Sequence, residues 1–546
     1  MKRLPLALVG GLIVIAALIP MSGGQLGFGG AASPSPGATP VAAATANATT
    51  GSGPSSDPSG PTTSPPATPD PVTPAPLTDV PVVPVTQFRA TVDSTGRDEV
   101  AAVLAGTSKR YEALELVEDQ ADAILAAVGA TRPTDASRLV LAKDAATLTT
   151  DLAKHRKRLA FLPAADVTPA VRALAWGKRT LFGVDRTKDL AEWSLNAPLP
   201  VAPEATAFDP TATWTLFAGG DILLDRGVYQ TIRIDGRGID FPFDGGTAEI
   251  TGRTCCSSFG WPVPQAKRTG NAGAMRHLIS SADIAIANFE NPAPNKFRWH
   301  TSKTVFTADP GIINGLVDAG IDYVSLANNH IGDAGDLGIL QTIANLEKRG
   351  LKYSGAGKDL DAARDPAMLE ANGVTVAILG YDAIAKGYYA GKDEIGSAQL
   401  SRKISANDIK WAREDGADIV IVFPHWGTEY QYKPFAAQQQ LAHDIIDAGA
   451  DMIIGNHAHY AAAVEIYQGK PIWYALGNFV FDQTWSEPTM EGVTLELTFE
   501  GAELVQSRMR PHIILDKAQP NFLDPAGDGR AVLGPIYDNS KGLLPY

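Results

Sequence analysis

Hydrophobic and polar positions divide the chain of 546 residues into segments with different patterns. Residues 1–22 contain an unbroken apolar run, and residues 23–85 are rich in Pro, Ser, Thr, Ala and Gly with few large side chains. Strand-like and helix-like patterns alternate over residues 86–205, and a Pro/Ala-rich linker separates them from a larger α/β pattern over residues 211–546. We therefore expect a targeting segment, a spacer, a small domain and a main domain.

The first segment predicts export. Lys2 and Arg3 precede the apolar run from Leu4 to Met21, and no further Lys or Arg occurs before Arg89. Basic residues that stay in the cytoplasm, followed by an apolar run, are typical of exported proteins. The run has 18 residues, which is long for a signal-peptide core and just enough to cross a bilayer. We expect a single-pass N-terminal membrane anchor with an extracytoplasmic domain; a cleaved signal peptide and a secreted protein are the alternative.

The two segments that follow differ in their capacity to fold. Residues 23–85 cannot bury enough apolar surface to offset the entropy of ordering, so we expect a disordered spacer. In residues 86–205 the expected strands are YEALELV, RLVLA, RLAFLP and KRTLFG, and the expected helices are TLTTDLAKHRKR and TPAVRALAW. Such alternation favours a small α/β domain with parallel strands. Nothing in this domain predicts a ligand, and its role stays open.

A recurring unit characterises the main domain. An Asp begins an apolar strand that ends in polar residues; the examples are SADIAIANFE (281–290), AGIDYVSLANNH (319–330), DGADIVIVFPHW (415–426) and AGADMIIGNHAH (448–459). We interpret these as strands of a layered sheet that deliver side chains to one edge. Ligands of open α/β sheets bind beyond the carboxyl ends of the strands, where these polar residues lie.

Carboxylate, amide and imidazole groups collect at these strand ends and at the end of the strand WTLFAGG. The candidates are Asp221, Asn288, Glu290, Asn328, Asn329, His330, His425, His457 and His459. Mixed oxygen and nitrogen donors suit Mn, Zn or Fe, and the absence of thiolates argues against a structural zinc site. Each histidine alone is more often structural. The whole set predicts divalent metal ions, since two carboxylates can bridge a pair of cations that activate a water. Asn478 in LGNF is either a turn residue or a further neighbour of the metals.

Charge and cysteine content narrow the class of protein. The net charge of −14 would repel phosphates over most of the surface, so we expect no nucleic-acid partner. The basic run KHRKR at 154–158 fits a solvated helix face. Cys255 and Cys256 are adjacent and are the only cysteines, so they form either a vicinal disulfide or two loop thiols. No disulfide framework holds this fold.

Several motifs of the main domain resemble those of a known family. They are GGDILLDR, ANFENP, SLANNHIGD, FPHWGTEYQ and IGNHAHYAAAVEIYQGKPIWYALGNFVFDQ. Over about residues 211–515 they are similar, in sequence and order, to the CapA family of capsule or poly-γ-glutamate biosynthesis proteins. That family is similar to calcineurin-like metallophosphatases. The resemblance therefore implies a four-layer α/β/β/α metallophosphatase-like sandwich with a centre of two divalent metal ions.

The resemblance also implies a first metal site with one departure from the superfamily pattern. Asp221 would bind one metal, Glu290 would bridge both metals, and His459 would return to the first site. Metallophosphatases carry a histidine two residues after the first aspartate, where this chain has Leu223. Their bridging carboxylate is an aspartate, and Glu290 has a longer reach. The first site is therefore incomplete unless Asp225 or water fills the gap.

The resemblance also implies a second metal site. Asn329, His425 and His457 would complete it. Arg226, just after the first motif, would meet an anionic group of the substrate.

His330 has a separate role in the resemblance, as the acid that protonates the leaving group without binding metal. The acidic residue that usually follows this histidine is replaced by Ile331. We expect Asp333 or Asp336 to orient the ring instead.

Three functional hypotheses follow. The first is a CapA-like envelope protein that acts on an anionic extracellular polymer or its precursor, with possible synthase or export partners. Its metal-dependent hydrolase-like site would cut or transfer an amide or ester bond. The second is an extracytoplasmic metallophosphoesterase. The third is a non-catalytic polymer-binding or scaffold component, which Leu223 favours because activity does not follow from the fold alone.

Overall fold

The computed structural model describes residues 77–201 and 206–544. The predicted anchor at residues 1–22 and most of the predicted spacer at 23–85 lie outside the described residues. Across the part of the chain that is described, no helix combines the length and apolar character needed to span a bilayer.

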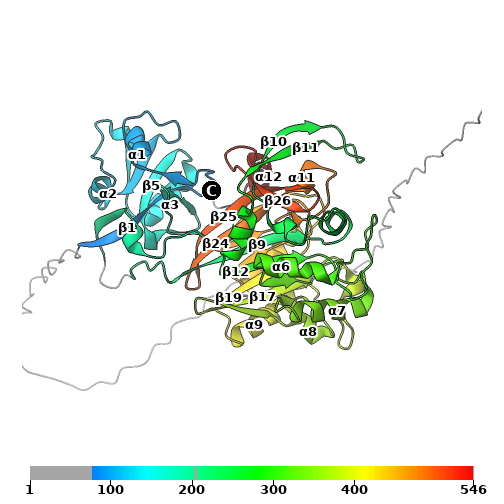
Figure 1. Cartoon of the computed structure of the whole chain (residues 1–546). Coiled ribbons are helices and arrows are strands. Elements are labelled where there is room, and N and C mark those ends of the chain that lie inside the picture. Colours follow the sequence, from blue (N-terminus) through cyan, green and yellow to red (C-terminus); the bar gives the residue numbers. More distant parts are fainter. Residues whose placement is uncertain (1–76, 202–205, 545–546) are drawn as a thin grey trace, which may run out of the picture. The chain divides into compact units, whose positions relative to one another are not determined.

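A six-stranded sheet forms the small domain, in the order β4-β3-β5-β1-β6 with β8 paired to β1 (Figure 1). Its strands are β1 (Leu77–Gln87), β3 (Ala113–Val117), β4 (Leu139–Ala142), β5 (Arg158–Pro163), β6 (Val171–Ala173) and β8 (Asn196–Pro200). A short pair is formed by β2 (Ser94–Thr95) and β7 (Ala175–Trp176), and the helices are α1 (Arg97–Leu104), α2 (Ala121–Ala127) and α3 (Ala145–Lys154). The predicted parallel pairing occurs where β3 lies between β4 and β5. Strand β1 instead pairs antiparallel with β5, β6 and β8.

Three details predicted for this domain differ from the structure. Strand β1 begins at Leu77, so the expected boundary at residue 86 falls inside it; prolines within the strand extend the composition of the spacer and conceal its buried valines. TPAVRALAW forms β6 and β7 rather than a helix, because its apolar side chains are buried in the sheet. KRTLFG forms a turn in which the Thr180 hydroxyl accepts from the N–H of Phe182 (3.2 Å).

The main domain contains two large sheets. The ten-stranded sheet has the order β11-β10-β26-β25-β24-β9-β12-β13-β14, and β23 also pairs with β9. Its strands are β9 (Thr213–Ile222), β10 (Thr247–Thr254), β11 (Val263–Gly270), β12 (Ile284–Phe289), β13 (Tyr323–Ser325), β14 (Lys352–Ser354), β23 (Asn478–Val480), β24 (Glu491–Glu500), β25 (Glu503–Leu515) and β26 (Gln519–Leu523). Cys255 and Cys256 lie between β10 and β11 and are joined as a disulfide, one of the two predicted alternatives.

The six-stranded sheet has the order β16-β17-β19-β20-β22-β21. Its strands are β16 (Ala367–Ala371), β17 (Val374–Asp382), β19 (Ile419–His425), β20 (Met452–Ile454), β21 (Val464–Tyr467) and β22 (Lys470–Trp473), and β15 (Ala356–Gly357) pairs separately with β18 (Gly396–Ser397). The helices of the main domain are α4 (Arg226–Tyr229), α5 (Ala274–Ser280), α6 (Ile313–Ala319), α7 (Gly335–Glu347), α8 (Leu360–Arg364), α9 (Arg402–Glu414), α10 (Ala436–Asp447), α11 (Glu487–Met490) and α12 (Arg530–Asn539).

Three apolar clusters order these elements into layers (Figure 1). One cluster joins inward residues of both sheets, such as Ile286 of β12 and Ile421 of β19. A second joins the ten-stranded sheet to α5, α6 and α7, and a third joins the six-stranded sheet to α8, α9 and α10. Along β12, Ile284 and Ile286 enter the first cluster whereas Ala285 and Ala287 enter the second, because successive side chains of a strand point to opposite faces. The α/β class is confirmed, and burial on both faces explains the continuous apolar runs in the sequence.

The recurring sequence units form parallel strands, but in two sheets rather than one. β9, β12 and β13 are parallel neighbours in the ten-stranded sheet, and β17, β19 and β20 are parallel neighbours in the six-stranded sheet. Asp221 pairs with Asn288 across β9 and β12, and Asp382 pairs with His425 across β17 and β19. Polar strand ends from both sheets can therefore meet.

Candidate metal centre

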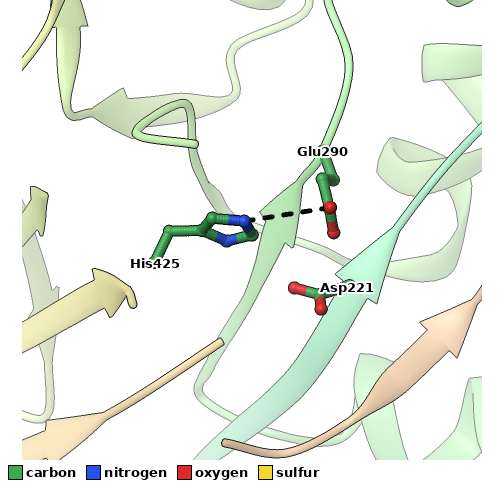
Figure 2. Close-up of side chains that lie close together, drawn as sticks. All are labelled: Asp221, Glu290 and His425. Atoms are coloured by element: carbon green, nitrogen blue, oxygen red, sulfur yellow. Dashed lines mark ion pairs between the residues drawn. The ribbon is translucent and has the colours of Figure 1, made fainter. Parts of the chain in front are cut away.

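Three strand ends bring two carboxylates and an imidazole together inside the main domain. Asp221 lies near the end of β9, Glu290 directly follows β12, and His425 ends β19. Each residue is at most 1% exposed, and one ligand atom from each lies within 4.8 Å of the other two (Figure 2). Because β9 and β12 belong to one sheet and β19 to the other, this group spans the two sheets.

The environment of Glu290 fits a bound cation. Its main-chain N–H donates to the carbonyl of Ile222 (2.9 Å), which fixes the residue against β9. Its Oε2 is buried without a hydrogen-bond partner among the described residues. Burial, followed by the negative charge of Asp221, raises the pKa of Glu290 well above its usual range. A divalent cation between the two carboxylates would give this oxygen the partner that the protein does not provide.

His425 has polar neighbours at both ring nitrogens, and its Nε2 also lies 3.8 Å from Oε1 of Glu290 (Figure 2). Its Nε2 lies 2.8 Å from Oδ1 of Asn329 and 3.0 Å from Nδ1 of His457. Asn288 donates through Nδ2 to Oδ1 of Asp221 (2.7 Å) and also lies 3.2 Å from Nδ1 of His425. Burial, and next the neighbouring His457, lowers the pKa of His425 well below its usual range. The ring is therefore neutral at physiological pH, the form in which imidazole binds metals.

His457 and His459 follow β20 on a backbone with positive φ, at 87° and 55°. This conformation is uncommon for residues with a Cβ and turns both rings back toward the strand ends. His459 Nδ1 lies 2.9 Å from Oδ1 of Asn478 and 3.4 Å from Oδ2 of Asp221, and its Nε2 lies 3.8 Å from Oε1 of Glu290. Burial lowers the pKa of His457 to about 3. The structure thus gathers all the predicted ligands into one network.

Neither Leu223 nor Asp225 extends this network. Leu223 is buried in a small apolar cluster with Phe306, Phe481 and Ile514, so the position of the missing histidine is filled by hydrophobic packing. The Asp225 carboxylate caps α4 and accepts a hydrogen bond from the main-chain N–H of Thr307 (2.8 Å). It also lies 2.6 Å from Nδ1 of His300. It is therefore not available to fill the gap in the first site.

His330 is placed differently from the other histidines. Its Nδ1 lies 2.9 Å from Oδ2 of Asp333, and its main-chain N–H donates to Oδ1 of Asn328 (3.2 Å). The ring packs at 4.3 Å from the Phe306 ring and stays partly exposed. Asp333 is the orienting residue, whereas Asp336 lies exposed in the first turn of α7. These contacts leave Nε2 of the partly exposed His330 ring without a partner among them.

Arg226 reaches the rim of the network but is already paired. Its guanidinium forms an ion pair with Asp482 and lies 4.6 Å from the Phe306 ring. Its Nη1 donates to the carbonyl of Lys303 (3.4 Å). The predicted contact with an anionic substrate group would therefore use a cation whose charge is partly balanced by Asp482.

Comparison with known proteins supports the sequence resemblance. Residues 215–483 match the family model described as bacterial capsule synthesis protein PGA_cap. This part of the chain belongs to the PGA_cap family. The predicted relationship to capsule and poly-γ-glutamate biosynthesis proteins is confirmed at the level of the family.

Two curated relatives show how far the similarity extends. Capsule biosynthesis protein CapA of Bacillus anthracis is 35% identical over 230 residues, which cover 40% of this chain and 56% of the relative. PGA biosynthesis protein CapA of Bacillus subtilis (strain 168) is 37% identical over 213 residues, which cover 38% of this chain and 56% of the relative. The chain thus spans about half the length of these relatives. The solved structure of the calcineurin-like phosphoesterase YfkN from Bacillus subtilis aligns with 15% identity and a TM-score of 0.31, covering 61% of this chain and 97% of that chain.

Sequence reasoning missed two carboxylates of this PGA_cap domain and left a third residue open. Asp482 pairs with Arg226, and Asp382 ends β17 beside His425, where burial raises its pKa. Both follow strands with polar endings (LGYD and FVFD), so the signal used for the other residues could have found them. Asn478, left open between a turn and a site residue, contacts His459.

Proposed function

We propose that this PGA_cap family protein acts in the biosynthesis, export or release of a capsular or poly-γ-glutamate polymer through a metal-dependent hydrolase-like site. The observation that carries the proposal is the buried group of Asp221, Glu290 and His425, in which Oε2 of Glu290 lacks a protein partner among the described residues. The names of the relatives, a capsule biosynthesis protein and a PGA biosynthesis protein, suggest the class of polymer. Residues 1–22 would anchor the protein in the cell membrane, with the site on the extracytoplasmic side.

The ligand set fits Mn, Zn or Fe, in one site or two. A single ion would be held by Asp221, Glu290 and His425. With two ions, Asp221, Glu290 and His459 would hold one, and Asn329, His425 and His457 would complete the other. When bound, the metal would supply positive charge that polarises the scissile group and makes water a stronger nucleophile. Two carboxylates and neutral imidazoles supply the mixed oxygen and nitrogen donors that such ions prefer.

The residues of the chain would position the substrate and deliver the proton. Asp333 holds Nδ1 of His330, which leaves Nε2 to donate a proton to the leaving nitrogen or oxygen of an amide or ester. Phe306 covers one face of the His330 ring and excludes water from that side. Asp382 and Asn478 would hold the surrounding strand ends in place.

A second candidate function is a polymer-binding or scaffold component that binds metal without catalysis. The apolar packing of Leu223 supports it, because one ligand of the superfamily pattern is replaced by a hydrophobic side chain. In this case the metal would stabilise the domain, and a synthase or export partner would carry out the chemistry.

Neighbouring substitutions in SLANNHIGD separate the two candidates. Asn329→Ala should lower the metal content of the purified full chain, because an amide ligand is lost. His330→Ala should keep its metal and its unfolding midpoint, yet lower turnover of poly-γ-glutamate or a model ester by about 10²–10⁴-fold, the usual contribution of a general acid. Loss of metal from His330→Ala would refute the assignment of roles. Full metal content in Asn329→Ala would refute the metal network, and unchanged turnover in His330→Ala would favour the scaffold.

A further inference from the structure

A basic loop borders the metal centre of this acidic protein. We define it as residues 295–305 (NKFRWHTSKTV), which contain no Asp or Glu. The side chains of Lys296, Arg298 and Lys303 are exposed and form no ion pair within the described residues. The chain as a whole has a net charge of −14, so a segment of eleven residues with three cations and no acidic residue is locally positive.

Aromatic side chains anchor the first half of the basic loop. The rings of Phe297 and Trp299 lie 4.7 and 5.7 Å from the ring of Tyr229, the last residue of α4. Both rings are partly buried, whereas Lys296 and Arg298 on alternate positions are exposed. The aromatic rings therefore fasten this half of the loop, while the two cations beside them reach solvent.

The middle of the basic loop is fastened to the first motif of the metal centre. Trp299 Nε1 donates to the carbonyl of Arg226 (3.0 Å). The His300 main-chain N–H donates to Oδ1 of Asp225 (3.0 Å), and its Nδ1 lies 2.6 Å from Oδ2 of the same carboxylate. Arg226 in turn donates to the Lys303 carbonyl. The cations are thus carried on a segment whose position is set by the strand end that presents Asp221.

The end of the basic loop continues to the predicted proton donor. Phe306 directly follows the basic loop. Its main-chain N–H donates to Oδ2 of Asp333 (2.8 Å), and its ring packs on the His330 ring at 4.3 Å. A group bound along the loop would therefore lead toward Nε2 of His330.

Acidic groups near the basic loop already have hydrogen-bond or ion-pair partners in the protein. Asp225 is paired with His300, Asp333 with His330, and Asp482 with Arg226. On the far side, Asp309 is paired with Arg233. The charge that the loop presents to an incoming molecule is therefore positive, although the surface elsewhere is acidic on average.

We propose that the basic loop binds a polyanionic chain bearing carboxylates and feeds it to the metal centre. The inference rests on the proposed function and adds the surface that holds the polymer. Charge complementarity selects a polyanion, and three unpaired cations spread over one loop fit a chain that carries several negative charges rather than a single small anion. A lipid headgroup would satisfy the cations but would not use the connection of the loop to Arg226 and His330.

The test is binding of the full chain to poly-γ-glutamate of defined length, measured by fluorescence anisotropy of labelled polymer. The triple variant Lys296→Gln, Arg298→Gln and Lys303→Gln should bind on the order of tenfold more weakly at 0.15 M salt. That difference should shrink at 1 M salt, where surface charges are screened. The matched control is Lys143→Gln, Lys154→Gln and Arg156→Gln, which removes the same charge from exposed positions of the small domain and should leave the affinity unchanged.

Each result has a definite meaning when alginate, dextran sulfate and phosphatidylglycerol vesicles are tested in parallel. Equal weakening in the loop variant and the control would reduce the effect to net charge and overturn the proposal. If the loop variant bound poly-γ-glutamate as tightly as the wild type, the basic loop would not be the polymer-binding surface, but the proposed function would stand. If only alginate or dextran sulfate bound in a loop-dependent way, the basic loop would be confirmed as a polyanion-binding surface, but poly-γ-glutamate would not be its ligand. No polymer binding, or loop-dependent binding of vesicles only, would overturn the polymer surface.

Discussion

Replacing Glu290 by glutamine should separate the metal role of this carboxylate from a purely structural role. In the absence of metal, Oε2 of Glu290 is a buried oxygen without a partner among the described residues, next to the buried carboxylate of Asp221. The substitution Glu290→Gln would place a neutral amide beside Asp221, whereas the wild-type carboxyl, whose pKa is raised by burial and by Asp221, must take up a proton to avoid repulsion. We therefore expect Glu290→Gln to be at least as stable as the wild type when a chelator removes all metal.

The magnitudes follow from the buried contacts and from linkage. An unsatisfied buried polar group costs about 1–3 kcal/mol, so the chelated variant should gain about 1 kcal/mol or more in unfolding free energy. A metal at about 100 times its Kd stabilises the wild type by about 2.7 kcal/mol. If loss of a carboxylate ligand weakens binding about a hundredfold, the same metal concentration would stabilise the variant by only about 0.4 kcal/mol.

The assay is urea unfolding of the full chain, with EDTA and with Mn²⁺ or Zn²⁺, together with metal analysis of the purified protein. Asp225→Asn is the matched control, because Asp225 is equally buried but has hydrogen-bond partners on both oxygens. This control should lose stability by a similar amount in both conditions and should keep its metal. The reasoning would be refuted if Glu290→Gln were destabilised to the same extent with and without metal, as expected for a structural acid.

Two further predictions test the neighbourhood of the site. Asp333→Asn should lower turnover by about 10–10²-fold with unchanged metal content, because the carboxylate that orients His330 is lost. The control Asp336→Asn should have no effect. Equal kinetics of the two variants would contradict the orienting role of Asp333. Burial raises the pKa of Glu491 to about 8 from 4.5, so folding favours its neutral form. Its stabilising contribution is complete below pH 4.5 and is lost, at about 1.4 kcal/mol per pH unit, as the pH rises toward 8. Glu491→Gln should flatten the plot of unfolding free energy against pH in that window, and an unchanged slope would contradict the assignment.

The strand-end part of the site could be predicted from the sequence because it follows from the physics of parallel strands. A strand buried on both faces reads as a continuous apolar run, and its first polar residues mark the sheet edge. Glu290 and His425 stand at such transitions, and both reach the centre. The order of motifs then linked them to a family, which the family comparison confirmed.

The parts that could not be predicted depend on contacts between distant segments. Periodicity identifies a strand but does not say which sheet it joins; only the family resemblance, with its α/β/β/α sandwich, implied a second sheet for strands such as β19. Composition also misled at β1, where prolines of the strand resemble those of the spacer. The use of Asp225 by His300 depends on a loop that lies 75 positions away and carries no regular pattern.

The site is therefore a consequence of how the two sheets pack, and this bears on the choice between enzyme and scaffold. Asp221 and Glu290 come from one sheet and His425 from the other, and the cluster that joins the sheets contains Ile286 and Ile421, close in sequence to these ligands. A metal bound by all three would stabilise the packed sheets in either case. Only an enzyme also needs His330 held by Asp333 with its other ring nitrogen left free of that contact. A scaffold gains nothing from that arrangement, so the His330–Asp333 pair is the feature that argues for catalysis.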